Sequence, residues 1–204
     1  MEVVAATNNQ HKLEEIRAIL KDIGYEVLSL DDVGIKIDIE ENGTTFRENA
    51  LIKAREIWRL TGKASIADDS GLEVFALNGE PGVYSARYAG VEGNEKDKAN
   101  NKKLLQNMKD IPENKRQARF VSAIAFIFSD GKEIITEGYI NGAIGHEEKG
   151  DNGFGYDPLF IIDGLDKTMA ELTSEEKNKI SHRANALEKL KKELIQSASQ
   201  NTNK

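Results

Sequence analysis

The stretch Ala64-Ser65-Ile66-Ala67-Asp68-Asp69-Ser70-Gly71 carries most of the information about the fold and the chemistry of this chain. Its first four residues form a short apolar run, which is typical of a buried strand. Two carboxylates, a hydroxyl and a glycine follow directly. Adjacent carboxylates repel each other unless a positive charge lies beside them, and a divalent cation that also holds phosphate oxygens is a frequent solution. The same residues also fit an ordinary turn.

The elements before this stretch alternate between strand and helix. Apolar residues at strand and helix spacing predict, in order, a strand at Val3–Ala6, a helix at His11–Ile23, a strand at Val27–Leu30, a helix at Thr45–Leu60 and the strand at Ala64–Ala67. Thr45 and Glu48 match a capping box, and Gly62 follows the last turn of that helix. The first third of the chain therefore reads β-α-β-α-β, which predicts an α/β fold with a sheet covered by helices.

The second part of the chain changes character. The pattern predicts a helix at Lys96–Met108, a β-hairpin of Gln117–Phe128 and Glu133–Ile144, a glycine-rich loop at Gly150–Gly155, a strand at Tyr156–Ile162 and a helix from Ser181 to about Ile195. We expect one elongated α/β domain over residues 1–196, with two lobes and a central substrate cleft between them. Residues 197–204 are expected to form a polar, disordered tail.

Composition limits the possible functions. The chain has 204 residues, a net charge of -7 and no cysteine. The acidic balance argues against a surface that binds nucleic acid, and the lack of cysteine excludes disulfides, thiolate nucleophiles and thiolate metal sites. The first residues lack the basic and apolar regions of a secretory signal, and no apolar run reaches the roughly 20 residues of a membrane helix. We therefore expect a cytoplasmic protein without a nucleic-acid or membrane partner.

A phosphate-binding segment is a candidate near the amino terminus. Thr7-Asn8-Asn9-Gln10-His11-Lys12 follows the first expected strand and opens a helix. Backbone N–H groups at a helix N-terminus attract phosphate, and the hydroxyl, amides and ammonium of this segment add donors. The glycine spacing of a Walker A loop is missing. The simpler alternative is that Asn8 or Asn9 only caps the helix.

Further candidates each have an ordinary alternative. Lys53 fits a solvated helix lysine, and Glu40-Glu41 fits an acidic turn before Asn42-Gly43. Phe154 lies between two glycines, where it can stack on a base or simply begin a strand. His182-Arg183 places cations at a helix start, against the macrodipole, and such a local misfit is tolerated where residues serve a ligand.

Together these segments resemble one family in order and spacing: the inosine/xanthosine triphosphate pyrophosphatases, which hydrolyse deaminated purine nucleoside triphosphates. The resemblance spans Thr7 to Arg183, nearly the whole chain. The matching stretches are Thr7–Lys12, Thr45–Ala50 with Lys53-Ala54, Ile66–Leu72, Pro81–Tyr88, Gly153–Pro158, and Lys177 with Ser181-His182-Arg183.

The resemblance implies a role for each matching residue. Asp69 would accept the proton of the attacking water, and Glu40 and Asp69 would hold Mg²⁺. The triphosphate would lie against Thr7, Asn8, Asn9, Gln10, His11 and Lys12, with Ser70 touching the substrate. The nucleoside would be surrounded by Phe154, Gly155, Tyr156, Asp157, Lys177, His182 and Arg183. Independently of the resemblance, Lys12 and Lys53 can clamp phosphates as point charges.

The resemblance also implies a homodimer and a long mixed β-sheet flanked by helices. One departure is Asn8, because the family usually has glycine after the threonine of this loop. Asn tolerates left-handed dihedrals better than most residues, so the loop can survive the change. In a strand Asp68 and Asp69 point to opposite faces. The sequence alone does not say which one faces the substrate, and the resemblance selects Asp69.

Three other functions stay open at this point. The chain could be a nucleotide-binding module without turnover, although an acidic pair beside a triphosphate serves a binder only with a metal. It could be an RNA- or DNA-binding protein, although the acidic balance and the lack of a basic stripe argue against this. Within enzymes, the alternative is a related pyrophosphatase that acts on pyrimidine or modified nucleotides.

Overall fold

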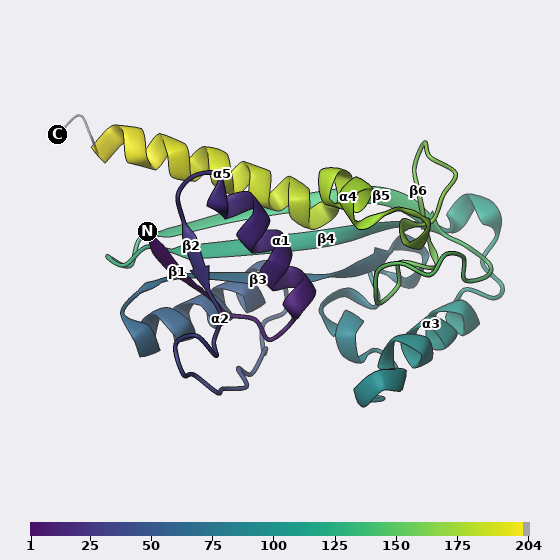
Figure 1. Cartoon of the computed structure of the whole chain (residues 1–204). Helices are drawn as coiled ribbons and strands as arrows, with labels where there is room; N and C mark the ends of the chain where they lie inside the picture. Colours follow the sequence, from purple (N-terminus) through teal and green to yellow (C-terminus); the bar gives the residue numbers. More distant parts are fainter. Residues whose placement is uncertain (202–204) are drawn as a thin grey trace. The chain divides into compact units, whose positions relative to one another are not determined.

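The structure is a computed structural model that describes residues 1–201, with side chains described as far as residue 199. Figure 1 shows the elements along the chain. They are β1 (Glu2–Ala5), α1 (Gln10–Lys21), β2 (Glu26–Leu28), α2 (Phe46–Thr61), β3 (Ala64–Val74), α3 (Lys96–Asn107), β4 (Gln117–Ile127), β5 (Glu133–Ile144), β6 (Phe160–Ile162), α4 (Ser174–Ile180) and α5 (His182–Asn201).

The strands form one mixed sheet in the order β2-β1-β3-β4-β5-β6. β1 pairs in parallel with both β2 and β3, whereas β5 and β6 are antiparallel. Parallel neighbours need a crossover, and α1 and α2 supply it for β1, β2 and β3. The predicted α/β class, with a mixed sheet flanked by helices, is therefore confirmed.

The chain divides into two compact units. The first comprises Met1–Asp69, Ser122–Gly138 and Arg183–Lys204, and the second comprises Ser70–Val121 and Tyr139–His182. β3, β4 and β5 each contribute residues to both units. The expected single domain with two lobes and a central substrate cleft stays a prediction.

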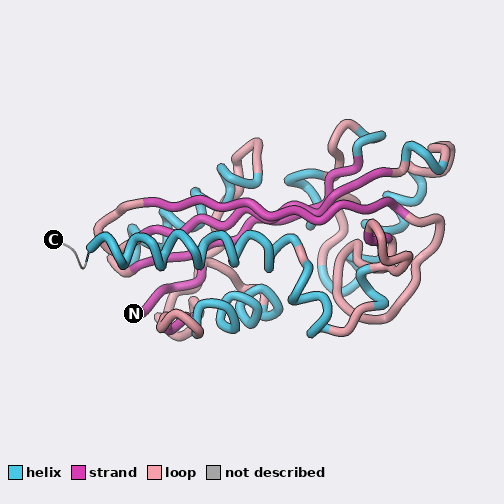
Figure 2. The backbone as a smooth tube through the Cα atoms, turned by 90° about the horizontal axis from the view of Figure 1, so that it is seen from above, coloured by secondary structure: helices cyan, strands magenta, loops and turns pink. Residues whose placement is uncertain are grey.

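The core of the first unit lies between the strands and two helices. Leu13, Ile16 and Leu20 of α1 and Leu187 and Leu190 of α5 are buried in one cluster with residues of β1, β3 and β4. Figure 2 shows the long α5 beside the strands of this unit, and the hydroxyl of Thr136 in β5 donates to the carbonyl oxygen of Ala186 at 2.9 Å. Hydrophobic burial thus fixes α1 and α5 over the same strands.

The second unit has a separate core. Leu104 of α3 and Met108, which directly follows α3, pack in a buried cluster with Phe120 of β4, Phe160 of β6 and Leu172.

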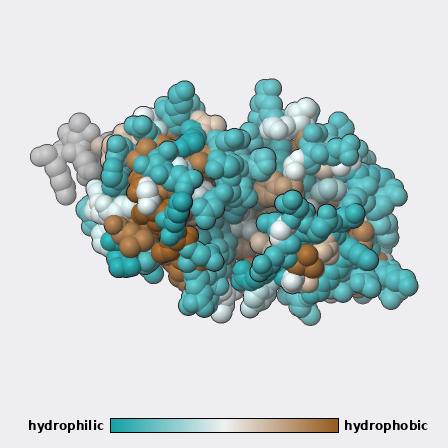
Figure 3. Space-filling model, turned by 60° about the horizontal axis from the view of Figure 1, so that its bottom comes forward, coloured by the Kyte–Doolittle hydropathy of each residue, from teal (hydrophilic) through white to brown (hydrophobic). Residues whose placement is uncertain are grey.

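On the face drawn in Figure 3, hydrophilic residues predominate and hydrophobic ones form separate groups. None of the helices described is both long and apolar enough to cross a bilayer.

Several element boundaries differ from the sequence expectations. β3 continues to Val74, so Asp68-Asp69-Ser70-Gly71 lies inside a strand and the turn interpretation is wrong. The strand expected at Tyr156–Ile162 begins only at Phe160, because Asp157 closes a turn back to Phe154 and Pro158 has no N–H for a ladder.

The carboxyl-terminal region also differs. α4 was not expected, although Thr173 and Glu176 form the capping box that begins it. α5 extends to Asn201 instead of ending near Ile195, so the expected disordered tail is helical from 197 to 201. Residues 202–204 of that tail lie outside the described residues.

Candidate active site

The alternation of β3 places its two adjacent carboxylates on opposite faces of the strand. Ala64 and Ile66 belong to the core under α1 and α5. Ser65 faces the other way and donates its hydroxyl to the carbonyl oxygen of Ala54 in α2 at 2.7 Å. Asp68 shares the face of Ile66, and Asp69 shares the face of Ser65. The two carboxylates therefore have different surroundings.

Asp68 is fully enclosed by partners within the first unit. Lys12 Nζ lies 2.5 Å from Oδ1, Arg183 Nε lies 3.0 Å from Oδ2, and the Ser122 hydroxyl donates to Oδ2 at 2.7 Å. Arg183 Nη1 also binds Glu15 Oε2 at 2.8 Å. These contacts join α1, β3, β4 and α5 around one buried carboxylate.

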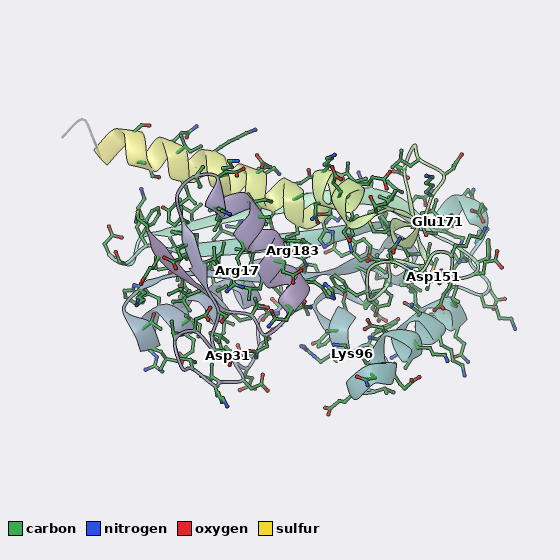
Figure 4. All side chains as sticks on the ribbon, in the orientation of Figure 1. Arg17, Asp31, Lys96, Asp151, Glu171 and Arg183 are labelled. Atoms are coloured by element: carbon green, nitrogen blue, oxygen red, sulfur yellow. The ribbon has the colours of Figure 1, made fainter. Side chains whose placement is uncertain are left out.

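The cations of this cluster respond to burial in different ways. Burial alone would lower the pKa of Arg183, but the carboxylates of Asp68 and Glu15 raise it well above its usual range. The Arg183 side chain, labelled in Figure 4 near the start of α5, is 1% exposed. Burial lowers the pKa of Lys12, although Asp68 opposes that shift. Of the two cations, Lys12 therefore loses its proton more readily than Arg183 does.

Asp69 has a less complete set of partners. Lys53 Nζ of α2 donates to Asp69 Oδ1 at 3.2 Å, to Glu41 Oε1 at 3.0 Å and to the carbonyl oxygen of Asp68 at 2.9 Å. Asp69 Oδ2 is buried and makes no hydrogen bond to any part of the chain that the structure describes. Burial raises the pKa of Asp69, Lys53 opposes this, and Glu41 adds to it. A buried oxygen in this state is available to a ligand or a proton.

Glu41 shares Lys53 with Asp69, whereas the family resemblance implied its neighbour Glu40. Glu40 is exposed, whereas Glu41 is half-buried on Lys53. The sequence contained a signal for this, because Ile35, Ile37 and Ile39 alternate with exposed residues and position 41 continues the inward row. Lys53 itself is buried, so its interpretation as a solvated lysine is wrong.

The segment from Thr7 to Lys12 forms the expected start of α1. Asn9 caps the helix by accepting the Lys12 N–H at 3.3 Å, and Thr7 Oγ1 accepts the Asn9 N–H at 3.1 Å. Asn8, Asn9, Gln10 and His11 are exposed. Among the described residues other than glycine, only Asn78 and Asp166 have positive φ, so Asn8 keeps an ordinary backbone without a glycine.

A second group of expected site residues lies in the second unit. Asp157 Oδ2 accepts the Phe154 N–H at 3.0 Å and Lys177 Nζ at 2.5 Å, and Lys177 Nζ lies 4.6 Å from the centroid of the Phe154 ring. Gly153 approaches Asp157 so closely that a Cβ there would lie 2.1 Å from Oδ2. Phe154, Asp157 and Lys177 therefore form one compact cluster.

The remaining expected residues of this unit serve the same loop. The N–H of Gly155, which the resemblance places at the nucleoside, donates to Asp97 Oδ2 at 2.9 Å. The Tyr156 hydroxyl donates to the carbonyl oxygen of Ser85 at 2.9 Å. The ring of His182 stacks on Phe120, with 5.0 Å between centroids. Ser70, half-buried in β3, is the first residue of the second unit.

The structure thus assembles three clusters from the expected residues. Two of them, around Asp68 and Asp69, lie in the first unit, and the third lies around Asp157 in the second. Glu15, Glu41 and Asp97 were missed as site residues. Glu15 follows Lys12 at a spacing of three, which places both on one side of α1, but the sequence does not show that Arg183 lies opposite.

Comparisons with known proteins were made for the whole chain. The Ham1 family model matches residues 3–193. A dITP/XTP pyrophosphatase of Bacillus licheniformis is 53% identical over 189 residues, which cover 93% of this chain and 95% of the relative. The enzyme of the same name from Haemophilus influenzae is 53% identical over 194 residues, which cover 94% of this chain and 98% of the relative.

Solved structures agree with the sequence comparison. The Ham1 protein of Staphylococcus aureus superposes with a TM-score of 0.87 at 44% identity, over 97% of this chain and 100% of that protein. A HAM1 protein from Coxiella burnetii gives a TM-score of 0.88 at 40% identity, over 96% and 99% of the two chains. The fold and the sequence therefore point to the same group of proteins.

Proposed function

The chain belongs to the Ham1 family, and from this premise we propose that it hydrolyses deaminated purine nucleoside triphosphates. The substrates are ITP, dITP and XTP, and the products are the nucleoside monophosphate and pyrophosphate. Relatives about 50% identical over nearly their full length carry the name dITP/XTP pyrophosphatase. In the structure, the observation that supports the proposal most is Asp69 Oδ2, a buried carboxylate oxygen with no hydrogen-bond partner among the described residues.

A divalent cation fits the surroundings of Asp69. Glu41 and Asp69 offer hard carboxylate oxygens, and the unpartnered Oδ2 is the natural ligand atom. The described residues contain no cluster of three or more potential ligands. A cation held by two carboxylates, with water and phosphate oxygens completing its shell, is the arrangement that Mg²⁺ favours. We therefore assign Mg²⁺ to Glu41 and Asp69, with Glu41 in place of Glu40.

The proposed reaction needs neutralised phosphates, a positioned water and a base. Mg²⁺, when bound, supplies charge neutralisation for the phosphate oxygens. Lys12 and Lys53 act as point charges on the triphosphate, and the N-terminus of α1, whose first turn holds no acidic residue, offers backbone N–H donors. Asp69 takes the proton of the attacking water as general base.

Phe154 and Lys177 are the proposed contacts to the base. Hypoxanthine and xanthine present an oxygen at C6, whereas adenine presents an amino group. Lys177 has only donors, so it accepts the first two bases and rejects the third. Arg183 is also expected from the sequence to read this oxygen. Arg183 binds two carboxylates, Asp68 and Glu15, whereas Lys177 pairs with one, Asp157, among the described residues. The ammonium of Lys177 carries three donors, so we assign selectivity first to Lys177.

A homodimer, which the family resemblance implies, and a cytoplasmic location, which the sequence predicts, complete the proposal. The alternatives of a binding module without turnover, a nucleic-acid binder and a pyrophosphatase for pyrimidine or modified nucleotides make different predictions. A single panel of triphosphates separates them.

The test is a panel of ITP, XTP, ATP, GTP and pyrimidine triphosphates with Mg²⁺, scored for pyrophosphate against orthophosphate. We expect pyrophosphate from ITP and XTP and little turnover of ATP. Lys177→Ala should narrow the gap between ITP and ATP, whereas Lys12→Ala should slow all triphosphates alike. Release of orthophosphate from ITP, or a preference for pyrimidines, would contradict the proposal.

A further inference from the structure

The segment that carries Glu41 is held by two side chains from the first turns of α2. Glu48 accepts the N–H groups of Thr44 at 2.6 Å and Thr45 at 3.2 Å, and Thr45 Oγ1 accepts the Glu48 N–H at 3.2 Å. These bonds form an ordinary capping box. The second contact reaches further, because Asn49 Oδ1 accepts the Gly43 N–H at 2.8 Å. No helix cap requires this bond.

Asn49 is an unusual residue for its place in α2. It is 0% exposed and lies one helical turn before Lys53, on the same buried face. Because the Gly43 N–H can only donate, it fixes Oδ1 toward Gly43 and turns Nδ2 away. Nδ2 is buried and has no hydrogen-bond partner among the described residues. Asparagine is also a weak helix former. An apolar residue at this position would avoid both of these free-energy costs.

Gly43 is fitted to this contact from the other side. A Cβ at Gly43 would lie 2.6 Å from Asn49 Oδ1 and 2.7 Å from Glu48 Cβ. Its φ does not lie in the left-handed region, so the glycine serves close approach and not an unusual backbone. The close approach of the Gly43 backbone to α2 therefore depends on two features. Residue 49 supplies a hydrogen-bond acceptor, and residue 43 has no side chain.

We propose that Asn49 is a positioning residue for the cation site. By holding Gly43, it fixes the chain two residues after Glu41, so that Glu41 reaches Lys53 and lies near Asp69. This inference rests on the proposed function in one respect, namely that Glu41 and Asp69 hold the divalent cation. Residues that orient metal ligands in this way contribute about 10–100-fold to metal affinity or activity.

Two variants disrupt the hydrogen bond between the Gly43 N–H and Asn49 Oδ1, one from each side. Asn49→Leu removes the acceptor, and Gly43→Ala pushes the backbone away from it. Asn49→Asp keeps an acceptor for the Gly43 N–H and replaces the unpartnered amide nitrogen with a second carboxylate oxygen, which adds a negative charge. The matched control is Asn101→Leu, since Asn101 is also a buried helix asparagine with an unpartnered side-chain atom among the described residues, but it lies in the second unit.

The measurement is binding of Mn²⁺ alone, without nucleotide, followed by the paramagnetic resonance signal of the free ion. We expect Asn49→Leu and Gly43→Ala to weaken Mn²⁺ binding about 10–100-fold, with Asn101→Leu close to wild type. Pyrophosphate release by the first two variants should need correspondingly more Mg²⁺. Amide hydrogen exchange at Gly43 should accelerate in Asn49→Leu and stay slow in Asn49→Asp.

Unchanged Mn²⁺ affinity in both Asn49→Leu and Gly43→Ala would overturn the inference, and so would an equal loss in Asn101→Leu. A wild-type protein that binds no Mn²⁺ would instead contradict the two-carboxylate cation site of the proposed function. In that case exchange at Gly43 decides whether Asn49 holds the segment, and slow exchange in Asn49→Leu would reject it.

Discussion

Asp68 and Asp69 are neighbours in one strand, identical in chemistry and both buried, yet the structure surrounds them differently. Both oxygens of Asp68 are bound, by Lys12, Arg183 and the Ser122 hydroxyl. Asp69 shares one lysine with Glu41 and keeps a buried oxygen without a hydrogen bond to any described residue. Strand alternation creates this difference, because it turns one carboxylate toward α1 and α5 and the other toward α2.

The comparison separates a structural carboxylate from a chemical one. A buried charge that is fully paired resists removal but has no capacity left for a ligand. A buried charge that is incompletely paired lowers stability, and it persists where a metal, substrate or proton uses it. We therefore assign Asp68 to holding the cluster together and Asp69 to catalysis.

The largest expected effect is the loss of activity in Asp69→Asn. The substitution keeps the shape but removes a proton acceptor and a charge, and loss of a general base costs about 10²–10⁴-fold in rate. Weaker metal binding should add to the loss. Initial rates of pyrophosphate release at saturating Mg²⁺ and ITP measure it. A fully active Asp69→Asn protein would contradict the assignment of Asp69 to catalysis and make Asp68 the candidate base.

Asp68→Asn should mainly lower stability, whereas Asp69→Asn mainly lowers activity. It leaves Lys12 and Arg183 without their shared carboxylate, and breaking a buried ion pair from one side costs about 3–5 kcal/mol. The free energy of unfolding from urea titration measures the loss. Arg183→Ala, which removes one of the two cations at Asp68 and the guanidinium at Glu15, should lower stability by a similar amount. Stability equal to that of wild type in both variants would remove the structural role of this cluster.

The third prediction concerns the pair Glu40 and Glu41, which the sequence alone does not distinguish. Glu41→Gln should raise the Mg²⁺ concentration needed for half-maximal activity about 10–100-fold, because it removes a charged ligand beside Asp69. Glu40→Gln serves as the matched control and should change it less than about twofold, since Glu40 is exposed. Magnesium titrations of both variants measure the difference, and the reverse order would restore Glu40 as the ligand.

The smallest expected effect is on stability and depends on pH. Burial raises the pKa of Asp69 above 3.8, so the folded state binds its proton more tightly than the unfolded state does. The ionised Asp69 therefore lowers stability above its folded pKa, and this cost disappears as pH falls below 3.8. Without metal, Asp69→Asn should melt at a higher temperature than wild type near pH 7 and at the same temperature in acid. A variant that is less stable near pH 7 would contradict the raised pKa.

Much of this architecture can be predicted from the sequence. The alternating elements, the capping box of α2 and the hairpin of β4 and β5 follow from periodicity and turn chemistry. The opposite orientation of Asp68 and Asp69 follows from strand geometry. The extension of β3 to Val74 does not, because Asp-Asp-Ser-Gly has the composition of a turn and only its neighbouring strands in the sheet hold it extended.

The site was less predictable where distant segments meet. Lys53 pairs with Glu41 across 12 positions, and Arg183 pairs with Glu15 across 168. No local pattern encodes the second of these contacts. The first was partly visible, because the alternation of Ile35, Ile37 and Ile39 points position 41 inward. Sequence patterns thus locate the candidate residues, and tertiary packing decides which of two neighbours lies at the proposed site.

The most direct test of this account is the titration of the Asp69 carboxyl carbon by ¹³C NMR, with Asp69→Asn used to assign the signal. We predict a pKa above the usual 3.8 in the metal-free protein, and a downward shift when Mg²⁺ is added, because the cation binds only the deprotonated carboxylate. A pKa at or below 3.8 that does not respond to Mg²⁺ would contradict the assignment of Asp69 as the carboxylate left available for catalysis.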